Sequence, residues 1–454
     1  MIRLILMLCL IAAPAAAHWT VLDDDARKQH VGSDLDANNA HLTEALQHEK
    51  FDAMDDSAFT FLRGAAHLYH RDLLESGALE KSAFRLPDTI TWLQGDAHVR
   101  NVGVFVDDRG EVVFDFDDFD QAWPGSYLVD VWRMASSLHL FADEAGFEDA
   151  GDRAARAFAE SYLETVKRFA GNDKEKNFQL DKGEATGPAR RLISETLDEE
   201  GRKVMTKEWT RGKKDHRRFR QLDDLERLEP TQEKLLRDAV KAWSAELEGF
   251  GEDYFRILDV ARRLKAGIGS RGVDRFYVLI EGPKKKKRDV ILDIKAQVAE
   301  PSLARLFELP SPASGPLPTA GCRVVLAERA MLAEADNHLG CLDLQGPDGS
   351  VQSFSIRQRN PYKKGMKAKK IDGAGDLEKL ATELGRVMAA AHSRADEDFK
   401  PGGVTGSFDD AFARAVASDE QQKAFIDEVS TFASQYAQQI TIDYDIFVDW
   451  LEAR

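Results

Sequence analysis

The segment 95–120 places the tightest constraint on the fold, because it holds two short apolar stretches between polar loops. Val102–Val106 and Val112–Phe116 are separated by the turn 107–110, which predicts two antiparallel strands joined in a hairpin. The second strand runs into four aspartates within six residues. Carboxylates packed so closely repel one another unless cations or hydrogen-bond donors compensate their charge. The segment therefore predicts a hairpin that leads into a site for cations or donor groups.

The spacing of polar residues in this segment is typical of kinase-type phosphotransferases. In these enzymes an Asp accepts the substrate hydroxyl proton, an Asn five positions later binds a metal ion, and a later Asp holds the metal that bridges the phosphates. Asp96 and Asn101 have this spacing, and Asp115 or Asp118 follows as the second metal ligand. We favour Asp118, because it lies just past the predicted strand, where the chain can turn toward a ligand. The expected metal is Mg²⁺, which proteins bind through one or two carboxylates together with substrate phosphates.

Other charged groups near this segment are predicted to support it. His98 is expected to be a structural hydrogen-bonding group, and Asp120 to belong to the surroundings of the metal ligands. Asp130 lies near a predicted helix start, is followed by Arg133, and is expected to brace the loop. Arg63 is expected either to support the same loop or to meet an anionic substrate. An acidic loop paired with arginines, without catalysis, is the alternative interpretation of the whole group.

A second group of residues lies near position 270. The segment Gly267-Ile268-Gly269-Ser270-Arg271-Gly272 precedes a predicted strand at 276–280, and the next predicted strand, 290–294, leads into Lys295. In kinases a glycine-rich loop covers the phosphates and a strand lysine contacts them. Gly267, Gly269, Ser270, Gly272 and Lys295 are therefore the candidate nucleotide-binding residues, with Lys295 also a candidate catalytic group. A tight turn before a hairpin is the alternative interpretation of the glycines.

The chain divides by pattern into four parts. Residues 1–17 have a basic start, an apolar run and small residues before a cleavage position, and are predicted to be a secretory signal peptide cut near Ala17-His18. Residues 18–250 contain the catalytic-loop-like segment and a helical insertion, 251–370 are strand-rich, and 371–454 are helical. A basic turn at 284–288 is interpreted as a solvated loop, and a basic run at 357–370 as a solvated loop or, alternatively, a phosphate clamp. The proline-rich stretch 310–318 is interpreted as a linker or a mobile loop.

These residues together resemble a bacterial family called domain of unknown function 2252, over most of the chain after the signal peptide. The resemblance implies an α+β, two-lobed, protein-kinase-like fold, similar to aminoglycoside and choline phosphotransferases around the catalytic loop. It also implies Mg and ATP as cofactors. Family members usually have an acidic residue directly after the strand lysine, whereas this chain has Ala296. If that acid supports the lysine, either Glu300 or Glu328 takes its place or the site is weakened. The matching segments are 59–66, 95–101, 118–120, 130–137, 267–272, Lys295, 323–325, 357–358 and 390–392.

The order of these segments differs from that of ordinary kinases. Kinases run from the glycine loop through the lysine to the catalytic loop. In this chain the catalytic-loop-like segment comes first, near residue 100, and the glycine segment follows near residue 270. The resemblance therefore implies a circularly permuted kinase-like fold.

Composition limits the classes of partner. The chain has 62 Lys and Arg and 79 Asp and Glu, which gives a formal net charge of −17. This negative charge argues against a general affinity for nucleic acid. No internal apolar run approaches the roughly 20 residues that cross a bilayer. Cys322 and Cys341 remain after the signal peptide is removed, and a disulfide between them is permitted in an oxidising compartment. The expected location is the periplasm or the outside of the cell.

Three functional hypotheses follow. The first is a phosphotransferase that moves a phosphoryl group from a nucleotide to an unknown acceptor. The second is a non-catalytic, kinase-like binding protein of the cell envelope, favoured by Ala296 and by the location. The third is a metal-dependent phosphoesterase, in which Asp96 and His98 would combine with Asn337-His338, the only Asn-His pair of the chain.

Overall fold

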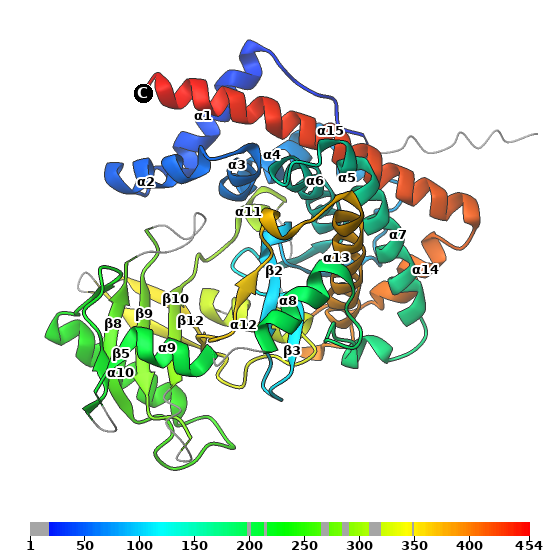
Figure 1. The fold of residues 1–454 in the computed structure, drawn as a ribbon. Coiled ribbons are helices and arrows are strands. Elements are labelled where there is room, and N and C mark those ends of the chain that lie inside the picture. The colour runs from blue at the N-terminus through cyan, green and yellow to red at the C-terminus, as the bar shows by residue number, and fades with distance from the viewer. Residues whose placement is uncertain are drawn as a thin grey trace, which may run out of the picture.

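The computed structural model describes residues 18–197, 201–212, 216–264, 272–283, 290–307, 319–346 and 349–454. The predicted signal peptide, the basic turn 284–288 and the proline-rich stretch 310–318 lie outside these residues, as does the glycine segment up to residue 271. Figure 1 shows a helical body with a lobe of antiparallel strands beside it. Mixed helices and antiparallel sheets confirm the predicted α+β class.

The second lobe is built on a six-stranded antiparallel sheet with the strand order β11-β12-β10-β9-β8-β7. The strands predicted at 276–280 and 290–294 are confirmed as β9 and β10. A two-stranded ribbon of β5 and β6 lies in the same lobe. The bounds are β5 (Thr210–Arg211), β6 (Arg218–Phe219), β7 (Leu225–Glu226), β8 (Ile257–Arg263), β9 (Arg275–Ile280), β10 (Val290–Ala296), β11 (Gly340–Gln345) and β12 (Val351–Gln358).

Alternation of side chains gives this sheet two different faces. Leu292 and Ile294 of β10 belong to the core that contains Trp243 of helix α10 (Pro230–Ser244). Ile291 points to the opposite face, in a smaller core with Met205 of α9 (Gly201–Trp209). Since successive side chains alternate, Lys295 shares the face of Ile291. At Lys295 this face meets the helical body, because Lys295 forms an ion pair with Asp120.

One apolar core runs through the helical body and joins both ends of the chain. Helix α13 packs along α7, and α15 crosses α6 and α7. The face predicted from the spacing of Leu377, Leu380 and Leu384 is confirmed as the buried face of α13. The bounds are α1 (Asp25–Asn39), α2 (Glu44–Met54), α3 (Ala58–Gly64), α4 (Ala66–Ser76), α5 (Ala78–Lys81), α6 (Leu128–Glu144), α7 (Gly151–Phe169), α8 (Gly187–Leu197), α13 (Ala374–Arg394), α14 (Phe408–Ala415) and α15 (Asp419–Glu452).

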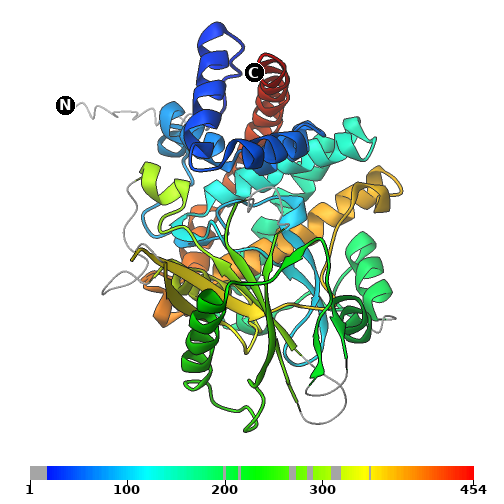
Figure 2. The same cartoon turned by 90° about the vertical axis from the view of Figure 1, so that its left-hand side faces the viewer.

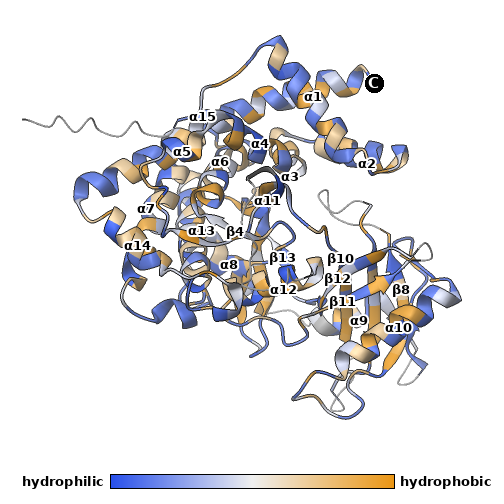
Figure 3. Cartoon of the chain, turned by 180° about the vertical axis from the view of Figure 1, so that it is seen from behind, coloured by the Kyte–Doolittle hydropathy of each residue, from blue (hydrophilic) through white to orange (hydrophobic). Residues whose placement is uncertain are grey.

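Figure 3 shows apolar residues concentrated in the strands of the sheet lobe, with hydrophilic residues along the outer turns of α1. Viewed from the side, the sheet lies below the helices of the N-terminal segment (Figure 2). Among the described helices, none combines the length and the apolar character that a bilayer span requires.

The lobes do not divide where the sequence pattern suggested. Strand β7 pairs with β8, and α10 contributes Trp243 to the sheet core, so part of the predicted 18–250 region belongs to the sheet lobe. Residues 371–454 share one core with the N-terminal helices rather than forming a separate unit. Pairing between distant segments, which composition does not reveal, sets both boundaries.

Several short elements connect the lobes. The predicted hairpin is confirmed as β2 (Val102–Val106) and β3 (Val112–Phe116), and β13 (Lys364–Gly365), which follows β12, adds to its edge. Strand β1 (Ile90–Leu93) pairs with β4 (Trp123–Ser126). Helices α11 (Ser302–Phe307) and α12 (Ala320–Met331) lie between β10 and β11. A disulfide joins Cys322 of α12 to Cys341 of β11.

Candidate functional site

The loop that carries Asp96 follows β1, and the side chain of Asp130 holds its backbone. Gly95 has a φ of +82°, and a Cβ there would lie 2.2 Å from the carbonyl oxygen of Gln121, so this turn requires glycine. Asp130, at the start of α6, accepts hydrogen bonds from the backbone nitrogens of Gln94 at 2.6 Å and Gly95 at 2.9 Å. His392 Nε2 lies 3.3 Å from Asp130 Oδ2. The backbone of the loop is therefore held by a fully buried carboxylate.

Asp96 pairs with Arg133 of α6. The Nε of Arg133 donates to Asp96 Oδ1 at 2.8 Å, and its Nη2 donates to the same oxygen and to the carbonyl of Leu62. Burial raises the pKa of Asp96 to about 6, although Arg133 opposes the shift. Asp96 Oδ2 has no hydrogen-bond donor within the described part of the chain, and His98 Nε2 lies 3.9 Å from it. Oδ2 is thus the oxygen that could accept a proton.

His98 and Asn101 lie in the same loop with different contacts. Burial, together with Arg63 and Arg133, lowers the pKa of His98 well below its usual value, so its ring is neutral. Asn101 Nδ2 donates to the carbonyl of Asp96 at 3.0 Å, while the Asn101 carbonyl accepts from the backbone nitrogen of Asp117 at 3.1 Å. In the residues that the structure describes, Asn101 Oδ1 has no donor. It is therefore free to serve as a metal ligand.

Asp115 is turned into the helical body. Its carboxylate is buried, lies 3.6 Å from the guanidinium of Arg394, and accepts from the backbone nitrogen of Phe116 at 2.8 Å. Burial raises the pKa of Asp115 to about 6, with Arg394 opposing. Arg394 is fixed by carbonyls of the same body, including that of Met331. Of the two predicted metal ligands, Asp115 is therefore the less suitable.

Asp117 and Asp118 follow β3 and lie in different surroundings. Asp117 Oδ1 is 3.1 Å from Lys363 Nζ. Asp118 is half-buried, and its carbonyl accepts from the side chain of Gln94 at 2.6 Å. Its Oδ1 accepts a long hydrogen bond of 3.4 Å from the backbone of Asp120, and among the described residues Asp118 forms no ion pair. Asp118 thus keeps a carboxylate that is available to a cation, close enough to Asp96 for the two charges to interact.

Lys295 and Asp120, which are 175 residues apart in sequence, form an ion pair. Gln297 Nε2 donates to the other oxygen of Asp120 at 3.0 Å, and Arg323 donates to the Asp120 carbonyl at 2.9 Å. Burial alone would raise the pKa of Asp120, but Lys295 lowers it to about 2. This pair connects strand β10 directly to the aspartate segment of the helical body.

The carboxylate that supports Lys295 is therefore not one of those predicted to replace the missing acid at Ala296. Glu300 is exposed. Glu328 lies 3.9 Å from Arg357, and its burial raises its pKa to about 7. The prediction of these two residues was wrong because the pairing carboxylate comes from the other lobe.

Arg63 lies at the last turn of α3 and faces the same space as Asp96. Its Nε is buried and has no acceptor in the described part of the chain. Burial and the nearby Arg100 lower the pKa of Arg63, whereas Asp96 and Asp118 act in the opposite direction. Of the predicted glycine loop only Gly272 is described, with a φ of +77°. Gly267, Gly269 and Ser270 lie outside the described residues.

A polar cleft of about 640 Å³ opens between the lobes, and Asp96, Asn101, Asp118, Lys295 and Arg63 are not among the residues that line it. Its walls include Asp117, which neighbours Asp118, and Asp293, which shares the strand face of Lys295. Arg357 and Lys363 also line it. Lys363 is exposed, as the interpretation of a solvated loop expects, whereas Arg357 is half-buried and lies on strand β12 rather than in a loop. The volume suits a small organic ligand. The lining combines five Lys and Arg side chains with seven Asp and Glu side chains, so the cleft has a mixed charge.

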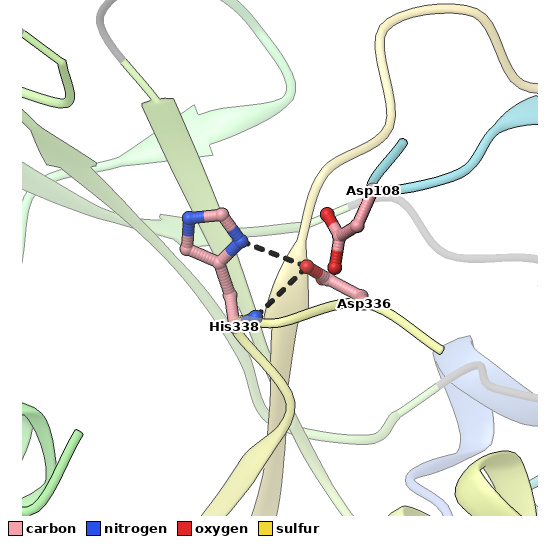
Figure 4. A group of neighbouring side chains, drawn as sticks. All are labelled: Asp108, Asp336 and His338. Carbon is pink, nitrogen blue, oxygen red and sulfur yellow. Dashed lines mark hydrogen bonds and ion pairs between the residues drawn. The ribbon is translucent and has the colours of Figure 1, made fainter. Parts of the chain in front are cut away.

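A second polar group on the cleft wall consists of Asp108, Asp336 and His338, shown in Figure 4. His338 donates to Asp336 Oδ1 from its backbone at 2.9 Å, and its Nδ1 lies 2.7 Å from the same oxygen. Its Nε2 lies 2.8 Å from the hydroxyl of Tyr254. Among the described residues, the carboxylates grouped with His338 are therefore those of Asp108 and Asp336.

Two residues that support the Asp96 loop, His392 and Gln94, have no role that the sequence predicts. His392 contacts Asp130 across 262 positions, and Gln94 links the Asp96 loop to Asp118. Gln94 could have been predicted from its position directly before Gly95. For His392 the sequence gives only its position in the segment 390–392, which matches the family.

A family model described as "Uncharacterized protein conserved in bacteria (DUF2252)" matches residues 42–450. Neither the curated proteins nor the solved structures contain a match to the chain. Because the family model covers most of the sequence, the chain belongs to the bacterial DUF2252 family.

Proposed function

We propose that this protein is a kinase-like phosphotransferase that moves a phosphoryl group from Mg-ATP, or another nucleotide, to an acceptor hydroxyl. The ion pair between Lys295 and Asp120 carries the proposal. It brings the strand lysine next to the aspartate segment that follows the Asp96 and Asn101 loop. A lysine on a strand, an Asp and Asn on one loop and a later Asp are the parts that phosphoryl transfer uses in kinases.

The order of elements in the sheet lobe supports the same interpretation. The glycine segment lies between β8 and β9, Lys295 lies on the next strand, and helices α11 and α12 follow before β11. Kinases likewise place the glycine loop, the strand lysine and a helix in this order. The proposed fold is therefore kinase-like and circularly permuted.

Each residue then has a defined task. Asp96 Oδ2 orients the acceptor hydroxyl and takes its proton, while Arg133 holds the other oxygen. Asn101 Oδ1 and the Asp118 carboxylate would hold Mg²⁺, and Lys295 would contact the phosphates beneath the 267–272 segment. Bound Mg²⁺ and nucleotide would supply charge neutralisation and the phosphoryl group. Arg63, with an unused Nε, would meet the transferred phosphoryl group or an anionic part of the acceptor.

The location that we propose is the periplasm or the cell exterior. The signal-peptide pattern at 1–17 motivates it, and the Cys322–Cys341 disulfide is consistent with an oxidising compartment. In that compartment ATP has no obvious supply. The second candidate is therefore a kinase-like protein that binds a ligand without turnover, favoured also by Ala296, which stands where family members usually have an acidic residue.

Turnover of ATP separates these two candidates. Wild-type protein is incubated with Mg²⁺ and ATP labelled on the γ-phosphate, and transfer to water or to a panel of alcohols is followed. We expect Asp118→Asn to raise the Mg²⁺ concentration needed for half-maximal rate more than about tenfold, because one ligand loses its charge. The exposed Asp152→Asn on α7 is the matched control. Absence of turnover in folded wild-type protein with every acceptor would favour the binding protein.

The rate should also depend on pH through Asp96. Its pKa of about 6 lies above the usual value for an aspartate, so below pH 6 the group is protonated and cannot accept a proton. We expect kcat/KM to rise with pH through a midpoint near this value. In Arg133→Gln the midpoint should move upward, because Arg133 lowers the pKa. A profile that is flat between about pH 5 and 8 would contradict a role for Asp96 as base.

A further inference from the structure

The geometry points to a calcium site on the helical body, formed by Asp173, Glu175 and Asp398. These residues lie on two segments, one after α7 and one after α13. One carboxylate oxygen from each lies within 4.8 Å of the others. Ligand oxygens lie roughly 2.4 Å from a bound Ca²⁺, so two of them can be up to about 4.8 Å apart. The three side chains are thus close enough to share one ion.

Glu175 supplies the independent observation. It is fully buried, and neither of its carboxylate oxygens has a hydrogen-bond partner among the residues that the structure describes. A buried carboxylate without a partner is costly, so a cation that it can bind would be strongly attracted. Lys176 pairs with the other two ligands and not with Glu175, since its ammonium lies 2.9 Å from Asp173 and 3.3 Å from Asp398, and a bound Ca²⁺ would replace it there. Burial also raises the pKa of Glu175 to about 7.

Two further carboxylates add negative potential without using up the site. Asp396 accepts from the backbone nitrogens of Asp398 and Phe408 at 2.9 and 2.8 Å. Asp409 accepts from Ser407 and from the backbone of Asp410, each at 2.7 Å. The negative charge of Asp409 raises the pKa of Glu175, and it also raises the pKa of Asp396. Both oxygens of Asp396 are occupied by donors, and Asp409 accepts its two hydrogen bonds at Oδ1, so the coordination of a cation is assigned to the three named residues.

The donor set selects the class of ion. All of the ligand atoms are carboxylate oxygens, which favours a hard cation over zinc or copper. The ligands come from two irregular segments, and Asp173 and Asp398 are partly exposed, with 78% and 35% of their side-chain surface accessible. Ca²⁺ accepts such an irregular shell and completes it with water, whereas Mg²⁺ demands near-octahedral geometry. An affinity of about 10⁻⁴–10⁻³ M is expected, as in extracellular modules.

The ion would reinforce the base of the candidate site. Arg394, the last residue of α13, donates to the carbonyls of Glu175 at 3.2 Å and of Phe178 at 2.9 Å. The same guanidinium faces Asp115 on β3, three residues before Asp118. Calcium at Glu175 would therefore fix the segment that anchors Arg394 and, through it, the end of the hairpin.

Calorimetric titration of the full chain with CaCl₂, together with melting curves from 0 to about 10 mM calcium, tests the site. We expect one binding event and a calcium-dependent rise in melting temperature. Asp398→Asn, at a partly exposed position, should weaken binding at least about tenfold, and Glu175→Gln should abolish it. Without calcium, Glu175→Gln should melt no lower than wild type, since it removes an unpaired charge.

One control keeps this site separate from the proposed function. Asp152→Asn, at an exposed position on α7, should bind calcium as wild type does, even if no nucleotide is ever bound. The inference is overturned if the melting temperature of wild type does not respond to calcium. It is also overturned if both Asp398→Asn and Glu175→Gln keep the full response, or if magnesium at equal concentration produces the same shift.

Discussion

Replacing Asp96 with asparagine is expected to lower phosphoryl transfer by about 10²–10⁴-fold while Mg-nucleotide binding stays within about threefold. The amide keeps the shape of the side chain, and its oxygen can still accept from Arg133, which donates to Asp96 Oδ1 at 2.8 Å from Nε. What is lost is the basic Oδ2, which has no donor among the described residues. The measurement is the single-turnover rate with saturating Mg-ATP, beside a calorimetric titration of the same sample.

The comparison needs a folded variant, since the Asp96 loop is also structural. A melting curve that matches wild type within a few degrees establishes this, and Asp152→Asn reports any effect of an Asp-to-Asn change elsewhere. If Asp96→Asn turns over ATP as fast as wild type, Asp96 is not the base and the loop has another role.

The largest effect on stability is expected at Arg27, far from the site. Arg27 of α1 donates to both oxygens of Asp72 at 2.6 and 2.8 Å, and its Nε donates to Asp443 of α15 at 2.8 Å. All three side chains are buried, with 3% or less of their side-chain surface exposed. The hydroxyl of Tyr436 also donates to Asp72 at 2.8 Å. This network ties the first helix of the body to the last.

Arg27→Met would leave two buried carboxylates without their cation. We expect this to lower the free energy of unfolding by about 3–5 kcal/mol, as is usual when one partner of a buried pair is removed. Urea denaturation measures the change. The matched control is Arg156→Met on α7, whose pairs with Glu160 and Asp427 are largely exposed and worth about 1 kcal/mol or less. Equal losses for the two variants would contradict the importance of burial.

Features encoded by neighbouring residues could be predicted from the sequence. Strands β2 and β3 were found because alternating apolar residues flank a turn, and the Asp96 and Asn101 spacing lies within one loop. The choice between Asp115 and Asp118 was harder. Asp115 is the last residue but one of β3. Its partner, Arg394, lies 279 positions later in the sequence (394 − 115), so the sequence does not show that the two meet.

Contacts between distant segments could not be predicted. The sequence suggests Glu300 or Glu328 as the partner of Lys295, whereas Asp120 of the other lobe forms the ion pair. His392 and Asp130, separated by 262 positions, meet only because α13 packs in the same core as α6. The lobe boundary expected at 250 failed for the same reason, since strand pairing of residues 225–226 assigns them to the sheet.

Calorimetric titration of the purified protein with Mg-ATP tests the central claim most directly, beside Asp118→Asn and Lys295→Ala. The proposed function predicts binding that requires magnesium and that both variants weaken, since one loses a metal ligand and the other a phosphate contact. Folded wild-type protein that binds no nucleotide at millimolar concentration would contradict it. The role of Lys295 and Asp118 in nucleotide binding would then be wrong, and a different ligand would have to be sought for this DUF2252 chain.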